Sequence, residues 1–274
     1  MLRLRLLTAA VLVPAALAGL FLLPNPVWAL ASGVFVLVGA WEWARLSGLA
    51  QAGRLIYAAA LGMAGAMVAQ WGGHGGPLVD AGVAHGLFLA GGLFWVLVAL
   101  PWLVAGWHCR HPVLLLSVGV LVLLPAWTGA VVLQPRPVQL LLLMATIWIA
   151  DSGAYFAGRR FGRHKLAPRV SPGKSWEGVA GAALAVVVWH FLAHRMAPGL
   201  LPGGAGWPGL ALLEALVAVS IVGDLFESWM KREAGLKDSG NILPGHGGVL
   251  DRIDSLTAAL PVAALMVWWT GGAA

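Results

Sequence analysis

The stretch Ser228–Asp254 reads SWMKREAGLKDSGNILPGHGGVLDRID and separates two strongly apolar segments. The whole chain has only 11 acidic residues, yet Glu233, Asp238, Asp251 and Asp254 all fall here. The turn 244–248, PGHGG, excludes a regular helix because it combines a proline with glycines. A solvated charged loop is one interpretation, but it does not account for a glycine-rich turn with a histidine between two sets of aspartates. The pattern favours a site that carries chemistry.

Composition places this site in a membrane protein. Of the 274 residues, 60% are hydrophobic and only 10% are charged, whereas soluble domains carry about 25% charged residues. The chain is therefore predicted to be an all-α, polytopic transmembrane helical bundle. The formal charge of +6 is explained by Lys and Arg on the cytoplasmic side of such a protein. No basic helix with interleaved aromatic residues accompanies this charge, so no nucleic acid partner is expected.

Apolar runs of about 20 residues define the helices that are expected to cross the membrane. Reading them between Pro, Gly and charged breaks gives nine spans, at about 6–23, 27–44, 55–71, 86–105, 113–133, 138–157, 176–197, 209–230 and 255–272. The first span follows Arg3 and Arg5, as the core of a signal peptide would. Its apolar run continues to Leu23 and is longer than a usual signal core, so we expect an uncleaved helix.

The basic residues indicate how these spans are oriented. With a cytoplasmic N-terminus, only Arg136 and Arg195 lie outside, and the inside segments hold Arg3, Arg5, Arg45, Arg54, Arg110, Arg159, Arg160, Arg163, Lys165, Arg169, Lys174, Lys231, Arg232, Lys237 and Arg252. This bias follows the positive-inside rule. It places the charged loops 158–175 and 231–254 on the cytoplasmic side of a bacterial-type inner membrane, where a cytosolic substrate can reach them.

Asp151 and Glu42 are carboxylates within apolar spans. Asp151 is inside the sixth span, where a charge costs roughly 2.5–3.5 kcal/mol, so it should face a partner or a wet cavity. A structural hydrogen bond to Tyr155 or to a serine is the alternative. Glu42 lies near the end of the second span beside Arg45, which predicts an interfacial ion pair rather than a catalytic role.

The segment 158–175 follows the sixth span and holds six basic residues, at positions 159, 160, 163, 165, 169 and 174. Its turn SPGKS, residues 171–175, precedes a helix whose first amides and dipole would assist the basic side chains in binding a polyanion. Anchoring to anionic lipid explains the charge alone but not the turn. A P-loop is excluded because its first glycine would fall at Pro168. Glu177 suits the first turn of the next helix whatever its function.

Carboxylates also gather at two helix ends. The end of the eighth span presents one polar face, formed by Asp224, Glu227, Ser228 and Lys231. Asp251 and Asp254, three residues apart, share a face at the start of the ninth. Clustered carboxylates repel one another unless a cation joins them, and Mg²⁺ prefers such oxygen ligands together with substrate phosphates. The pattern predicts a metal-dependent phosphoryl or nucleotidyl transfer.

Residues from about 145 to 260 resemble the phosphatidate cytidylyltransferases, also called CDP-diacylglycerol synthases. The family signature is Ser, two spacers, Lys-Arg, four spacers, Lys-Asp, a small-residue turn, Pro-x-His-Gly-Gly, two spacers and Asp-Arg-x-Asp. This sequence meets it at Ser228, Lys231, Arg232, Lys237, Asp238, Pro244, His246, Gly247, Gly248, Asp251, Arg252 and Asp254. Upstream, Gly173 and Ser175 depart from a lysine and a threonine that are common in the family.

The resemblance implies that CTP and phosphatidate react to give CDP-diacylglycerol and pyrophosphate, with Mg²⁺ and in a homodimer; a second cation such as K⁺ stays open. It implies that Asp224 and Asp251 bind the metal with support from Asp254. The phosphate contacts would be Lys231, Arg232 and Lys237, and the substrate-binding residues Asp151, Ser171, Lys174, Ser175, Glu177, Ser228 and Arg252. Asp238 and His246 would be substrate contacts or turn formers. Residues 1–135 would be a scaffold with dimer contacts, and 136–274 the catalytic region.

Two other functions remain as alternatives. A membrane CTP-dependent lipid kinase would transfer the γ-phosphoryl group to a lipid alcohol and would need a base for that alcohol. A transporter also carries acids within the membrane, but its usual inverted repeats are not evident in this sequence.

Overall fold

The computed structural model describes residues 2–70 and 77–271. Within them lie nine helical segments, and each overlaps one of the nine predicted spans. They are α1 (Leu2–Leu22), α2 (Asn25–Leu46), α3 (Gln51–Gln70), a continuous segment of α4 (Ala81–Leu93), the π-helix η1 (Phe94–Ala99) and α5 (Leu100–Ala105), α6 (Pro112–Leu133), α7 (Pro137–Phe161), α8 (Trp176–Met196), α9 (Trp207–Glu233) and α10 (Leu250–Trp269).

Seven of these segments are long and apolar enough to cross a membrane, which makes the chain an integral membrane protein. They are α2, α3, the α4–α5 segment, α6, α7, α8 and α9. Among the described residues, α1 and α10 fall outside this set. The first turns of α10 carry Asp251, Arg252 and Asp254, which lower its mean hydropathy. The count of nine spans and the cytoplasmic N-terminus therefore stay predictions.

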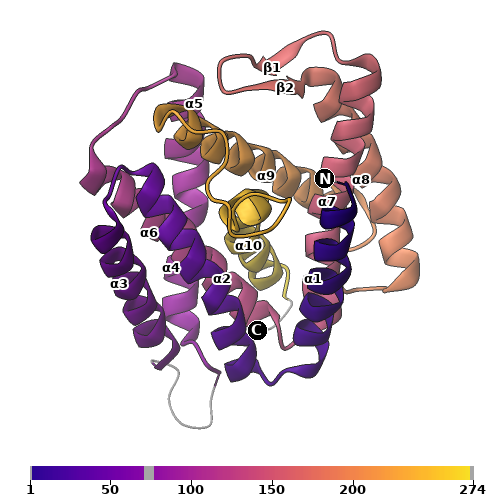
Figure 1. Cartoon of the computed structure of the whole chain (residues 1–274). Coiled ribbons are helices and arrows are strands. Elements are labelled where there is room, and N and C mark those ends of the chain that lie inside the picture. The colour runs from indigo at the N-terminus through magenta and orange to yellow at the C-terminus, as the bar shows by residue number, and fades with distance from the viewer. Residues whose placement is uncertain (1, 71–76, 272–274) are drawn as a thin grey trace.

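The helix α10 lies in the middle of the bundle, where Figure 1 shows it almost end-on. It packs against α9 and α7 from the C-terminal half and against α2, α4 and α6 from the N-terminal half. One hydrophobic core runs through both halves, so residue 135 is not a break in packing. The separate roles assigned to residues 1–135 and 136–274 stay predictions.

The helices α7 and α8 form the closest helix pair because glycines line their contact. A Cβ atom on Gly181 would lie 2.8 Å from the carbonyl oxygen of Gly153, and one on Gly153 would lie 2.7 Å from that of Gly181. Small residues of this kind let helix backbones approach closely in membranes. This contact fixes where α7 presents Asp151 relative to the start of α8.

Both charged loops are shorter than predicted because the helices continue beyond their apolar runs. The helix α7 extends to Phe161, and its last turn carries Arg159 and Arg160, which interact favourably with the helix dipole. Between α7 and α8 lies a two-stranded antiparallel hairpin, β1 (Lys165–Ala167) and β2 (Ser171–Ser175), which the all-α expectation did not include. Ser175 ends β2 and caps α8 by accepting a 3.2 Å hydrogen bond from the Gly178 amide.

The second loop consists of residues 234–249, because α9 continues to Glu233 and α10 already begins at Leu250. Gly245 and Gly247 adopt φ angles of 76° and 87°, which are readily available only to glycine. The turn predicted at 244–248 is therefore confirmed.

We expect the change Gly181→Ala to lower the stability of the protein by about 1–3 kcal/mol, because the added methyl group would force α7 away from α8. Thermal unfolding of the detergent-purified protein measures this effect. Gly86→Ala is the matched control, since a Cβ atom on Gly86 in α4 meets nothing within 4 Å. Equal unfolding temperatures for the two variants would contradict the assigned contact.

Candidate active site

A cavity of about 720 Å³ lies between α7, the β1–β2 hairpin, α8, α9 and α10. Many of the residues predicted from the sequence line it, namely Asp151, Ser171, Lys174, Ser175, Asp224, Asp251, Arg252 and Asp254. Segments far apart along the chain thus place carboxylates, hydroxyls and cations around one space. The helix α7 also lines the cavity with Trp148, which the sequence analysis did not select, and with Tyr155 and Arg159. Arg159 donates a 3.0 Å hydrogen bond to the Tyr155 hydroxyl.

The hairpin is joined to α9 by two side chains. Lys174 on β2 forms a 2.7 Å ion pair with Asp224. Arg232 donates from Nε to the carbonyl oxygen of Val170 at 3.3 Å, just before β2. Both lysine and aspartate are about three-quarters buried, so the ion pair is partly shielded from water. The Ser171–Ser175 segment is therefore held against the carboxylates at the end of α9.

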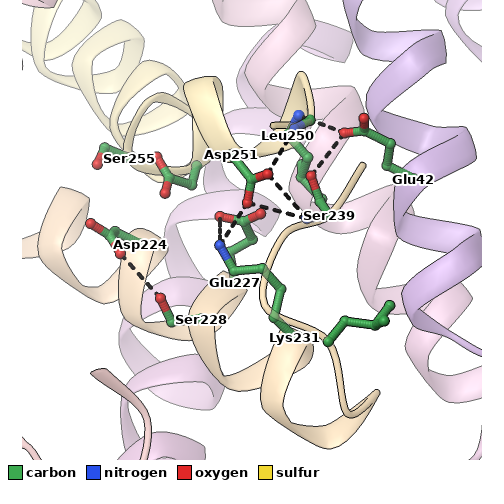
Figure 2. Close-up of polar contacts among 12 residues, drawn as sticks. Glu42, Asp224, Glu227, Ser228, Lys231, Ser239, Leu250, Asp251 and Ser255 are labelled. Carbon is green, nitrogen blue, oxygen red and sulfur yellow. Dashed lines mark hydrogen bonds and ion pairs between the residues drawn. The ribbon is translucent and has the colours of Figure 1, made fainter. Parts of the chain in front are cut away.

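A buried lysine links α9 to α10. The Lys231 ammonium lies 3.3 Å from a Glu227 oxygen and 2.7 Å from Asp251 Oδ1, as Figure 2 shows. The side chains of Lys231, Glu227 and Asp251 are only 11%, 3% and 6% exposed. Because the Lys231 ammonium is already paired with Glu227 and Asp251, its first role is to compensate these two carboxylates. Lys231, which was predicted to contact phosphate, is not among the residues that line the cavity.

Asp251 has several donors besides Lys231. Its Oδ2 accepts from the Gly248 amide at 2.8 Å and from the Ser239 amide at 3.0 Å. Burial would raise the pKa of Asp251, but the hydrogen bond from Lys231 and those from the two amides outweigh it and lower the pKa. Asp251 is therefore ionised where it faces the cavity.

The two other predicted metal ligands have fewer partners. Asp224 accepts a long, 3.4 Å hydrogen bond from Ser228 in addition to its ion pair with Lys174. Asp254 accepts from the Ser255 amide at 2.7 Å. One oxygen of Glu227 is buried and has no hydrogen-bond partner among the described residues. Four carboxylates of α9 and α10 thus lie beside two lysines, Lys174 and Lys231.

Other predicted residues lie outside the cavity. Lys237 and Asp238 are exposed in the 234–249 loop, and His246 contacts the carbonyl oxygen of Pro244 at 3.4 Å. Glu177 accepts hydrogen bonds from the backbone amides of Arg163 and His164 and from the His164 ring. It therefore fastens the end of α7 to the start of α8. Ser228 and Arg232 act through their bonds to Asp224 and Val170 and do not line the cavity.

The acidic residues fit a metal ion that is shared with a substrate. In the described part of the chain, no three His, Cys, Asp or Glu side chains are arranged to hold a metal by themselves. Mg²⁺ is commonly held by one or two carboxylates, with substrate phosphates and water completing the coordination. Asp224, Asp251 and Asp254 all line the same cavity and supply enough oxygen ligands for that arrangement.

The prediction for Glu42 was wrong. Its side chain is fully buried, and within residues 2–70 and 77–271 it forms no ion pair. It accepts hydrogen bonds from the 234–249 loop and from Leu250, as Figure 2 shows. The neighbouring Arg45 instead donates to the Ser239 carbonyl at 3.1 Å. A contact between residues so far apart in the sequence leaves no local sequence pattern from which it could be predicted. The one sequence feature that pointed to Glu42 was an acidic residue near the end of an apolar helix.

Comparison with known proteins agrees with the predicted chemistry. Residues 3–270 match the model of the "Cytidylyltransferase family". A phosphatidate cytidylyltransferase of Pseudomonas aeruginosa is 48% identical over 99% of this chain and 98% of its own length. That of Haemophilus influenzae is 40% identical over 95% of this chain and 96% of its own. A Thermotoga maritima protein of the same name is 46% identical over 45% of this chain and 46% of its own.

We expect the change Lys231→Met to destabilise the protein by about 3–5 kcal/mol, because it leaves Glu227 and Asp251 buried without their cation. Lys237→Met is the matched control, since the Lys237 side chain is exposed and belongs to the same sequence motif. Thermal unfolding of both variants in detergent measures the difference. If Lys231→Met unfolds at the temperature of the control, the compensating role of Lys231 is wrong.

Proposed function

Because the chain belongs to the cytidylyltransferase family, we propose that it transfers the cytidylyl group of CTP to phosphatidate, giving CDP-diacylglycerol and pyrophosphate. This reaction makes it a nucleotidyltransferase of phospholipid biosynthesis. The observation that carries the proposal is the cavity in which Asp224, Asp251 and Asp254 face Lys174 and the SPGKS strand. Relatives that cover nearly the whole chain are named for the same activity.

The arrangement suits an in-line displacement at phosphorus. A phosphate oxygen of phosphatidate attacks the α-phosphorus of CTP, and the bond from that phosphorus to the oxygen bridging to the β-phosphate breaks. The phosphate nucleophile is ionised near neutral pH, so no dedicated general base is required. Charge moves onto the pyrophosphate that leaves, and Lys174, Arg159 and Arg252 at the cavity wall are placed to stabilise it.

Magnesium belongs to this proposal because the carboxylates outnumber the cations beside them. Asp224 and Asp251 would hold it, with Asp254 in support. When bound, the ion supplies positive charge to the triphosphate. Lys174 and Lys231 now neutralise Asp224 and Asp251, and Lys174 is free to move toward a phosphate once a metal compensates Asp224. The exposed Lys237 and the hairpin-bound Arg232 are second choices as phosphate contacts.

We place the cavity at the cytoplasmic face of a bacterial inner membrane, because the basic residues are concentrated in the loops on that side, as the positive-inside rule requires. The basic hairpin lines the cavity, and it belongs to the loop that this bias puts inside. A homodimer formed through the N-terminal helices is part of the same proposal and rests on the family resemblance alone.

A product assay tests the reaction and its residues together. Purified protein with CTP, Mg²⁺ and phosphatidate in mixed micelles is expected to release CDP-lipid and pyrophosphate in equal amounts. Asp224→Asn and Asp251→Asn are expected to lower turnover by about 10²–10³-fold, as loss of transition-state electrostatics does. Glu233→Gln is the control, because Glu233 pairs with the exposed His108 away from the cavity. Conversion of CTP to CDP without pyrophosphate would instead indicate a lipid kinase, and no turnover of CTP would point to transport.

Removal of the metal gives an independent prediction. We expect EDTA to abolish the turnover of the wild-type protein, and we expect added Mg²⁺ to restore it, because the carboxylates lack sufficient cations of their own. Replacing K⁺ by choline in the same assay tests whether a second cation takes part. Full turnover in EDTA would refute the proposed metal dependence without affecting the assignment of the products.

A further inference from the structure

Three hydrogen-bond donors from the 234–249 loop and the start of α10 converge on the Glu42 carboxylate. Its Oε2 accepts from the Ser239 hydroxyl at 3.0 Å and from the Leu250 amide at 2.8 Å, and its Oε1 accepts from the Val249 amide at 3.1 Å. The neighbouring Arg45 donates to the Ser239 carbonyl. A glutamate from the second helix of the chain thus binds the turn that precedes the aspartate-bearing helix.

Ser239 connects this carboxylate to the active site. Its hydroxyl is bound by Glu42, its carbonyl oxygen by Arg45, and its backbone amide donates to Asp251 at 3.0 Å. All three hydrogen-bonding groups of the residue are therefore used, and its side chain is fully buried. Figure 2 shows the resulting line from Glu42 through Ser239 to Asp251. Any shift of Glu42 is transmitted to a cavity carboxylate through one residue.

Two glycines of the loop leave the space that Glu42 fills. A Cβ atom on Gly240 would collide with Glu42 Oε1, and one on Gly248 would collide with the Ser239 hydroxyl and lie 2.6 Å from both Glu42 oxygens. Gly248 in turn donates its amide to Asp251. The close approach of Glu42 thus explains why position 248, the second glycine of the Gly-Gly pair in the signature, has no room for a side chain.

The cost of this arrangement indicates that it serves more than packing. A fully buried carboxylate without a Lys or Arg partner is expensive, and the cost is reduced here by three donors, two of which are amides at the start of α10. A carboxylate is the side chain that can accept all of these bonds, because an amide such as Gln offers only one acceptor oxygen.

We infer that Glu42 is a positioning residue for the transfer reaction, holding Ser239 and the first turn of α10 so that Asp251 faces the cavity in its working orientation. This inference rests on the proposed function. Glu42 itself does not line the cavity. It acts through Ser239, Val249 and Leu250.

The test compares Glu42→Gln and Ser239→Ala in the purified full-length chain. Thr128→Val is the matched control, because Thr128 is a fully buried residue of the N-terminal half whose hydroxyl bonds only to its own helix, at Leu124. Hydrogen–deuterium exchange of peptides covering residues 238–251 reports the order of the loop. Steady-state kinetics with CTP, phosphatidate and Mg²⁺ report kcat and KM, and thermal unfolding reports stability.

For Glu42→Gln we expect faster exchange confined to residues 238–251 and a fall in kcat of roughly 10- to 100-fold, the scale that a misplaced catalytic group produces. The KM for CTP is expected to change by less than about threefold, because the nucleotide-facing hairpin is untouched, and Thr128→Val should match the wild type in exchange and kcat. Ser239→Ala keeps the amide bond to Asp251 and should give a smaller change in the same direction.

Several results would overturn the inference. Faster exchange with kcat within twofold of the wild type would show that the loop need not be held, and a loss of kcat with unchanged exchange would show that Glu42 acts in another way. If Glu42→Gln does not fold, Ser239→Ala decides, and wild-type exchange and kcat in that variant would refute the role. An inactive wild type would instead refute the proposed function first, and the inference with it.

Discussion

The ion pairs of Lys231 with Glu227 and Asp251 hold together the two helices on which the candidate site is built. Carboxylates this deeply buried are tolerated only when a cation or several hydrogen-bond donors compensate them, and removal of one partner typically costs 3–5 kcal/mol. Lys231 compensates two of them at once. The orientation in which Asp251 on α10 is held beside α9 depends on this compensation.

The same constraint explains how the cavity is lined. Each carboxylate has a different kind of partner: a lysine from the hairpin for Asp224, a lysine and two amides for Asp251, and a helix amide for Asp254. The partners of Asp224 and Asp251 come from other elements, so those elements must be in place before both charges are compensated. A metal ion with its substrate phosphates would add the remaining positive and negative charges in the same space.

The sequence predicted the helices well because nine long apolar runs have few alternatives in a chain with so little charge. It also predicted that Asp224, Asp251 and Asp254 would meet, since helical spacing places each on a polar face. The sequence did not show that Lys231 and Lys237 have different environments, because the motif does not reveal where α9 ends. Lys231 lies inside the helix and is buried, whereas Lys237 lies in the loop and is exposed. The β1–β2 hairpin was missed because its short strands lie within a run of basic residues. Glu42 was missed because its partners lie 197 to 208 residues further along the chain.

That separation between Glu42 and its donors has a consequence for biosynthesis. The helix α2 leaves the ribosome before Ser239, Val249 and Leu250, which follow Glu42 by 197 to 208 residues. At typical translation rates of 5–20 residues per second, the interval is roughly 10–40 s. During that time the acid at the end of α2 has to be solvated by water or protonated, and the helices that are already inserted enclose no finished cavity. Assembly of the candidate site is therefore completed only when the 234–249 loop and α10 arrive, because they bring the donors of Glu42 together with Asp251 and Asp254.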